Sequence, residues 1–118
     1  MTYKANMTCK EFKIQYALGT IDEDSLCRIA MITKNKSILK ILSNHEDFDV
    51  RSFVAENSRT SIKVLITLSK DNHPNIRHEV AMNPNTPMKV IEKLCIDENY
   101  WVSHDALIQL KSLRKHDS

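Results

Sequence analysis

Apolar residues in the middle of the chain recur at the three- and four-residue spacing of one helix face. Val50, Phe53 and Val54 form one such stripe, and Val64 and Leu68 belong to a second. No stretch shows the strict alternation of apolar and polar residues that marks a half-buried strand. The pattern therefore predicts an all-α fold built from short amphipathic helices.

The two stripes return after a fixed interval. The segment that begins at Asp49 aligns without a gap with the segment that begins at Asn75, 26 positions later. The matched pairs are Val50 with Ile76, Arg51 with Arg77, Val54 with Val80, Ala55 with Ala81, Asn57 with Asn83, Thr60 with Thr86, Leu68 with Leu94, and Asp71 with Asp97. Self-similarity at a fixed period is the sequence signature of stacked repeats. The chain therefore contains two clear copies of one unit.

A degenerate unit precedes the two clear copies, and a half unit follows them. Their matching apolar residues are Ile38, Leu39 and Leu42 before, and Val102, Ala106 and Leu107 after. Ile29 and Ala30 fit the register only after a one-residue deletion. We therefore expect one domain over residues 1–118. Its parts would be a capping helix (1–19), a degenerate repeat (20–49), two clear repeats (50–75 and 76–101), and a half repeat with a C-terminal cap (102–118).

Each unit is expected to contain two helices joined by polar turns. Asn57 and Asn83 stand where the first helix must end, and asparagine tolerates the left-handed conformation that often follows a helix. Thr86 and Pro87 fit the N-cap and the first position of the second helix. Thr60–Ser61 is a weaker copy of the same signal.

Both ends of such a stack need a cover over their apolar faces. At the N-terminal end, Thr8 and Glu11 have capping-box spacing and Gly19 is a natural helix stop, which predicts a helix over residues 9–18. Thr20 repeats the spacing and is expected to begin the next helix. At the other end, the expected covering residues are Tyr100, Trp101, Leu107, Leu110 and Leu113. Trp101 has a second interpretation, an exposed anchor for a binding partner.

The residues in the string VRxxVAxNxxTxxxVLxxLxxD carry a resemblance to a known family. The string, within roughly residues 45–110, resembles the leucine-rich repeat variant, a HEAT-like helical repeat, although the unit here is slightly longer than that family's. The resemblance implies a right-handed α-solenoid that binds other macromolecules and brings no catalytic residues, and the count of units predicts about four helix pairs. Some family members carry an iron–sulfur cluster on a cysteine-rich segment. No such segment is present, so the resemblance implies no cofactor here.

The amino-acid composition indicates the class of protein and the cellular compartment in which we expect it. The 42% hydrophobic and 27% charged residues are the balance of a globular protein rather than a disordered one. No apolar run is long enough for a membrane span or a secretory signal, so we expect no membrane partner. Three scattered cysteines argue against a disulfide framework and for a reducing, cytoplasmic location. The bias toward Ile, Lys and Asn is typical of a low-GC bacterial or phage genome.

The candidate chemical groups are better explained by structure than by catalysis. His78 and His104 share a register, but packed helices lie about 8–10 Å apart, whereas zinc ligands lie about 2 Å from the metal. Cys9, Cys27 and Cys95 lack CxxC spacing and a recognisable base. We therefore predict no catalytic residue, no metal site and no cofactor, and thus a protein that is not an enzyme.

Charge placement is the most informative functional feature. Lysines fall opposite the buried stripes of the second helices, whereas the turns between units are acidic. The candidate partner-binding lysines are Lys36, Lys40, Lys63, Lys70, Lys89 and Lys93. Stacked Arg51 and Arg77, partly exposed Ile62, Ile66 and Met88, and Trp101 complete the candidate set.

Three interpretations of this face remain. It can be a solvated helix surface, with Lys70 favouring a helix C-terminus. It can also bind a partner protein through an acidic or helical segment, and so regulate or inhibit that partner by occupying its surface. The third interpretation is nucleic-acid binding through phosphate contacts, which a net charge of only +2 makes less favoured.

Leu68→Ala and Leu94→Ala test the assignment of the buried stripe. Each substitution is expected to lower the free energy of unfolding by about 2–5 kcal/mol, because it deletes methyl groups from a packed core. Thermal melts of the two variants measure the loss. Unchanged melting temperatures in both variants would show that the stripe is misassigned.

Overall fold

A computed structural model describes residues 7–117 of the chain. Within that range the regular structure consists of eight helices and contains no strand, which confirms the all-α prediction. The helices are α1 (Cys9–Leu18), α2 (Glu23–Ile32), α3 (Lys36–Leu42), α4 (Phe48–Glu56), α5 (Ile62–Leu68), α6 (Pro74–Met82), α7 (Met88–Leu94) and α8 (Tyr100–Asp117).

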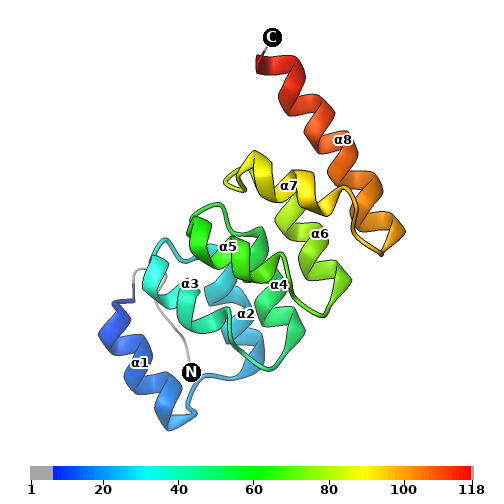
Figure 1. Ribbon diagram of the computed structural model, residues 1–118. Coiled ribbons are helices and arrows are strands. Elements are labelled where there is room, and N and C mark those ends of the chain that lie inside the picture. Colours follow the sequence, from blue (N-terminus) through cyan, green and yellow to red (C-terminus); the bar gives the residue numbers. More distant parts are fainter. Residues whose placement is uncertain (1–6, 118) are drawn as a thin grey trace.

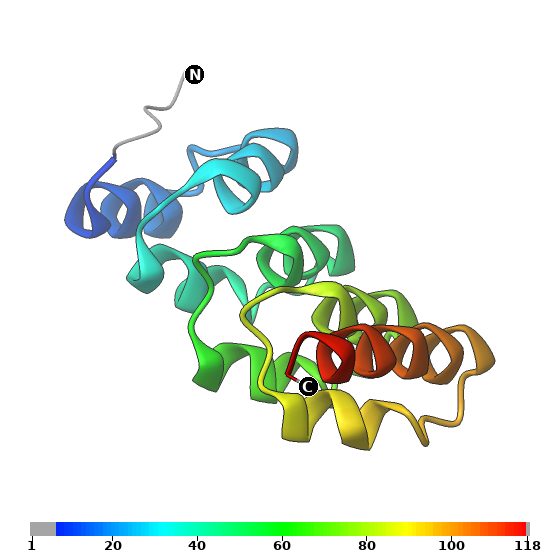
Figure 2. The same ribbon diagram turned by 90° about the horizontal axis from the view of Figure 1, so that it is seen from above.

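The helices form two layers. The first helices of the units, α2, α4, α6 and α8, lie side by side in a row (Figure 1). The second helices, α3, α5 and α7, lie together on one side of that row, as Figure 2 shows from above. Helices α1 and α8 lie at opposite ends of a molecule that measures 47 × 27 × 19 Å along its principal axes.

The apolar stripes meet between the two layers. Leu39, Leu65 and Ile91 occupy the same position in α3, α5 and α7, and all three are buried. Val54 and Val80 on the first helices are also buried and belong to the same hydrophobic core. Burial of one such side chain contributes about 1.5–3 kcal/mol, so this interior row is what keeps the short second helices in place.

The N-terminal helix begins and ends where the sequence predicts. The Thr8 hydroxyl accepts a hydrogen bond from the Glu11 N–H, and Gly19 ends α1 with a φ of 68°. Phe12 on α1 is fully buried. The expected start of the next helix at Thr20 is wrong, because Asp22 is the N-cap of α2 and accepts from the Ser25 N–H.

The left-handed conformation expected at Asn57 and Asn83 is also wrong. Their φ and ψ angles, −68° and 123° for Asn57 and −73° and 126° for Asn83, are extended. The Asn57 side-chain amide instead donates to the carbonyls of Ala30, at 2.9 Å, and Thr33, at 3.0 Å. These carbonyls belong to the preceding unit, so the asparagine joins one unit to another.

Asn83 repeats the contact one unit later. Its side-chain amide donates to the carbonyls of Ala55, at 2.7 Å, and Asn57, at 3.0 Å. Its side-chain oxygen accepts from the Asn85 N–H at 2.8 Å. An amide that is both donor and acceptor can satisfy both sides of the buried turn, and buried polar groups require such partners. We call the contacts of Asn57 and Asn83 the asparagine ladder.

The threonines of the repeat have a role that differs from the predicted one. Thr86 is not the N-cap of α7, since Pro87 occupies that position without a side-chain hydrogen bond. The buried Thr86 hydroxyl donates to the Val80 carbonyl at 2.7 Å, and Thr60 makes the equivalent bond to Val54. Both threonine hydroxyls therefore bond to a backbone carbonyl near the end of the first helix, and neither caps the start of the second helix.

The C-terminal end is covered by only some of the expected residues. Helix α8 packs against α6 and α7 through buried Val102, Ala106 and Leu110, with Leu113 partly buried. Tyr100, Trp101 and Leu107 are exposed, so their expected role in the cover is wrong. None of the three shares the face of α8 that carries the packed residues, because an α-helix has 3.6 residues per turn.

Asn83→Gly distinguishes the asparagine ladder from a simple backbone requirement. Glycine suits a left-handed position, but it removes the amide and leaves two carbonyls without their donor. We therefore expect a loss of about 1–3 kcal/mol in the free energy of unfolding, measured by urea titration. Asn44→Gly, at an exposed residue, controls for the extra flexibility of the unfolded chain. Equal losses in the two variants would contradict the ladder.

Candidate functional site

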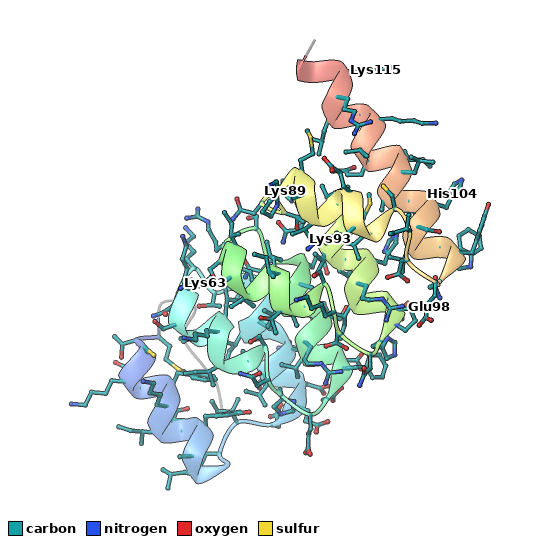
Figure 3. The ribbon with its side chains drawn as sticks, viewed as in Figure 1. Lys63, Lys89, Lys93, Glu98, His104 and Lys115 are labelled. Atoms are coloured by element: carbon teal, nitrogen blue, oxygen red, sulfur yellow. The ribbon has the colours of Figure 1, made fainter. Side chains whose placement is uncertain are left out.

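The outward side of the second helices is rich in lysine. We name the exposed residues Lys36, Lys40, Lys63, Lys70, Lys89 and Lys93 the lysine face. Glu92 is the only acidic residue within α3, α5 and α7. None of the six lysines forms an ion pair with a residue that the structure describes. Figure 3 labels Lys63 on α5 and both Lys89 and Lys93 on α7.

The helix geometry explains this placement. Helix α5 buries Val64, Leu65 and Leu68, so Lys63 and Thr67 must point outward. The same register in α7 exposes Lys89 and Lys93. Because the buried stripe fixes the rotation of each helix, the lysines of successive helices are presented on one side.

A groove opens between α3 and α5 on this face. Its volume is about 280 Å³, and its lining residues are Lys40, Ser43, Asn44, Ser61, Lys63, Val64 and Thr67. Lys40 and Lys63 supply ammonium groups from two different helices, and the remaining polar residues supply hydroxyl and amide groups. The lining contains no acidic residue, so the α3–α5 groove suits an anionic side chain or segment.

The three apolar residues predicted to contact a partner differ in their exposure to solvent. Ile62 and Ile66 on α5 are exposed, at 50% and 39% of their full surface. Met88 is partly buried and packs against the core. The lysine face therefore has exposed apolar surface on α5.

Arg51 and Arg77 use their donors inside the chain. Arg51 Nε lies 2.9 Å from an Asp71 carboxylate oxygen, and Arg77 Nε lies 2.8 Å from an Asp97 carboxylate oxygen. Arg77 is buried, and Arg51 is partly buried. Each guanidinium links the turns before and after its own unit. We call these contacts the arginine ladder and do not include them in the lysine face.

The ion pair of Arg77 with Asp97 changes the proton affinity of both groups. The hydrogen bond with Asp97 raises the pKa of Arg77. Burial alone would raise the pKa of Asp97, but hydrogen bonds from Arg77 and the Asn99 N–H outweigh it and hold that pKa below its ordinary value. The folded state therefore favours the charged carboxylate.

Trp101 lies on α8, where it is 67% exposed, as its interpretation as a binding anchor requires. It lines a cavity of about 260 Å³ together with Pro74, Asn75, His78, Asn99, Val102 and Asp105. His78 Nε2 lies 2.6 Å from Asp105, and His104 Nδ1 lies 3.2 Å from the other Asp105 oxygen. These histidine contacts lower the pKa of Asp105.

Sequence reasoning missed Asp105 as the partner of His78 and His104. The available signal was its register, because Asp105 follows acidic Glu79 by 26 positions. Register alone does not reveal that one carboxylate reaches histidines from both α6 and α8. That contact depends on how closely the two helices pack.

Negative charge gathers where the first helices begin. A hydrogen bond with Asp47 and the charge of that residue raise the pKa of Glu23. The main acidic residues near the starts of α2 and α4 are Asp22, Glu23, Asp24, Glu46, Asp47 and Asp49. Acidic residues therefore gather near the starts of α2 and α4, on elements that do not belong to the lysine face.

The cysteines and the metal-ligating residue types are the remaining chemical candidates among the described residues. Burial raises the pKa values of Cys27 and Cys95, which disfavours their reactive thiolate forms. Among the side chains of residues 7–115, no three His, Cys, Asp or Glu are grouped closely enough to bind a metal ion. A cavity of about 500 Å³ lies beside Cys9, and its described lining residues include no carboxylate or histidine. They are Met7, Thr8, Cys9, Ile32, Thr33, Lys34 and Asn35.

No helix in the described part of the chain has the length and apolar character needed to cross a membrane. Comparison with protein-family models, curated proteins and solved structures finds no match to the chain. The surfaces described above are therefore the features that bear on the function of the protein.

Asp97→Asn tests the charge of the arginine ladder. A lowered folded-state pKa contributes stability above the unfolded value of about 3.9, and that contribution is lost as pH falls through the folded pKa. We expect the variant to lose about 1–3 kcal/mol near neutral pH and to show a shallower decline in acid. Urea titrations from about pH 7 to about pH 2 measure both effects.

Asp24→Asn is the matched control, because Asp24 is exposed and forms no ion pair with a described residue. This control should keep the neutral-pH stability and the acid decline of the unmodified protein. An Asp97→Asn variant with the same acid decline as the unmodified protein would refute the role of the ion pair.

Proposed function

We propose that the protein is a small, non-catalytic interaction module that holds an acidic, preferably helical, segment of a partner protein on its lysine face. In this proposal the chain is a right-handed, HEAT-like stack that resembles the leucine-rich repeat variant. Binding would regulate the partner by occupying part of its surface. The observation that carries the proposal is the α3–α5 groove, with lysines from two helices and no acidic residue in its lining.

The stack would present its lysines at fixed positions. Lys40 and Lys63 flank the groove from separate helices whose rotations are set by buried Leu39 and Leu65. A receptor with little backbone freedom loses little entropy when it binds. Each exposed ion pair contributes only about 0–1 kcal/mol, so useful affinity requires several lysines together with apolar contacts at Ile62 and Ile66.

The arrangement favours an acidic protein segment over a nucleic acid. Single-stranded nucleic acids are usually bound by basic grooves combined with aromatic side chains on which bases stack. Here exposed Tyr100 and Trp101 belong to α8, and the three helices of the lysine face contain no aromatic residue. A partner helix with carboxylates and leucines matches both the lysines and the exposed isoleucines.

The test compares Lys63→Glu/Lys89→Glu with Lys13→Glu/Lys111→Glu. Both double variants change the net charge equally, but Lys13 and Lys111 are exposed on α1 and α8, outside the lysine face. The probe is a fluorescein-labelled amphipathic helical peptide rich in glutamate and leucine, and anisotropy measures its affinity. We expect at least about a tenfold loss, equivalent to about 1.4 kcal/mol, in the first variant only, with both thermal melts nearly unchanged.

Two outcomes would overturn the proposal. Equal losses in the two double variants would indicate general charge attraction rather than binding at the lysine face. A labelled oligothymidylate that binds more tightly than the peptide, with affinity falling steeply as salt rises, would replace the protein partner with a nucleic acid.

A further inference from the structure

The arginine ladder also satisfies backbone carbonyls, and it does so in the same way twice. Arg51 Nη1 donates to the carbonyls of His45, at 2.9 Å, and Glu46, at 3.0 Å. Arg77 Nη1 donates to the carbonyls of Asp71, at 2.8 Å, and Asn72, at 3.3 Å. In each of these two units, one guanidinium therefore donates hydrogen bonds to two successive carbonyls of the turn before the first helix.

The next unit has the two equivalent turn carbonyls but no arginine at the position that corresponds to Arg77. Asp97 and Glu98 follow Asp71 and Asn72 by 26 positions, and Ser103 follows Arg77 by the same interval. The short Ser103 hydroxyl donates to the Tyr100 carbonyl at 3.1 Å. Within residues 7–114, no donor is hydrogen-bonded to the carbonyl oxygen of Asp97 or Glu98. The turn between α7 and α8 thus presents two acceptors that arginine satisfies in the other units.

The surroundings of these carbonyls favour a cation. The Glu98 side chain is exposed and forms no ion pair with residues 7–114. Figure 3 shows Glu98 at the start of α8, away from Lys63 and Lys89. A positive group at this corner would therefore meet a carboxylate that has no ion-pair partner among those residues.

The exposed aromatic ring of Tyr100 lies on the same face of α8 as Ser103. Tyr100 precedes Ser103 by three residues, a spacing that places two side chains on one helix face. Tyr100 holds the register position of Phe48, whose ring stacks on His73 with centroids 4.1 Å apart. Tyr100 is 66% exposed and contacts only neighbouring α8 rings, those of Trp101 and His104, among the described aromatic residues. A guanidinium can stack on such a ring.

We propose that the corner formed by Asp97, Glu98, Tyr100 and Ser103 binds an arginine side chain presented by a basic segment of another protein. The guanidinium donates to the carbonyls of Asp97 and Glu98, as Arg51 and Arg77 do in their own units. It also pairs with the Glu98 carboxylate and lies against Tyr100. A lysine ammonium is a compact point charge without the planar fork of donors, so arginine is preferred. This site is separate from the lysine face and has the opposite charge preference.

The probe is a short peptide of alternating glycine and arginine, compared with its glycine–lysine counterpart. Amide chemical shifts report binding at Asp97–Ser103, and the fluorescence of Trp101, the single tryptophan, reports it independently. We expect the arginine peptide to shift these amides and change the fluorescence, with the lysine peptide at least about fivefold weaker. Equal affinities, or shifts confined to the acidic residues around Glu23 and Asp47, would overturn the proposal.

Ser103→Arg supplies the guanidinium from within the chain. This variant should lose the response to the arginine peptide, whereas Ser112→Arg, at an exposed α8 residue with the same charge change, should retain it. Glu98→Gln provides a second test at an exposed side chain and should weaken binding severalfold, which does not depend on how well Ser103→Arg folds. Unaltered arginine-peptide binding in both Ser103→Arg and Glu98→Gln would refute the site.

Discussion

The contact on which the structure depends is the one between a buried side-chain amide and the carbonyls of the preceding unit. Each second helix contains only seven residues, which is too short to be stable alone. Asn57 and Asn83 hold the turns between helices at fixed positions, and the arginine ladder does the same at the opposite ends of α4 and α6. With both ends of α4 and α6 tied to neighbouring units, the apolar stripes of α3, α5 and α7 come into register.

This constraint links the fold to the surface. If Leu65 and Ile91 are held inside, Lys63 and Lys89 must lie outside. The net charge of +2 does not reveal this exposed row of lysines, because acidic residues, which lie mainly at the starts of the first helices, balance it. The two proposals therefore assign a nearly neutral protein two surfaces of opposite preference, one for an acidic segment and one for arginine.

The sequence predicts the helices, the buried stripes and the start and end of α1, because these follow from local spacing and capping. It predicts the exposure of Lys63 and Lys89 for the same reason. It does not explain Asn57 or Thr86 correctly, and for Trp101 it leaves two interpretations open, of which only the exposed position agrees with the structure. The partners of Asn57 lie 24 and 27 positions away, and the bond of Thr86 runs back to Val80, so propensity at the helix end cannot reveal either contact.

The exchange of side-chain amide protons tests the central claim most directly. If the asparagine ladder joins the units, the side-chain NH₂ resonances of Asn57 and Asn83 should persist after transfer into D₂O. Those of exposed Asn44 and Asn72 should disappear at once, because they have no such bonds among the described residues. Loss of the Asn57 and Asn83 resonances as fast as those of Asn44 and Asn72 would show that the units are not joined in this way.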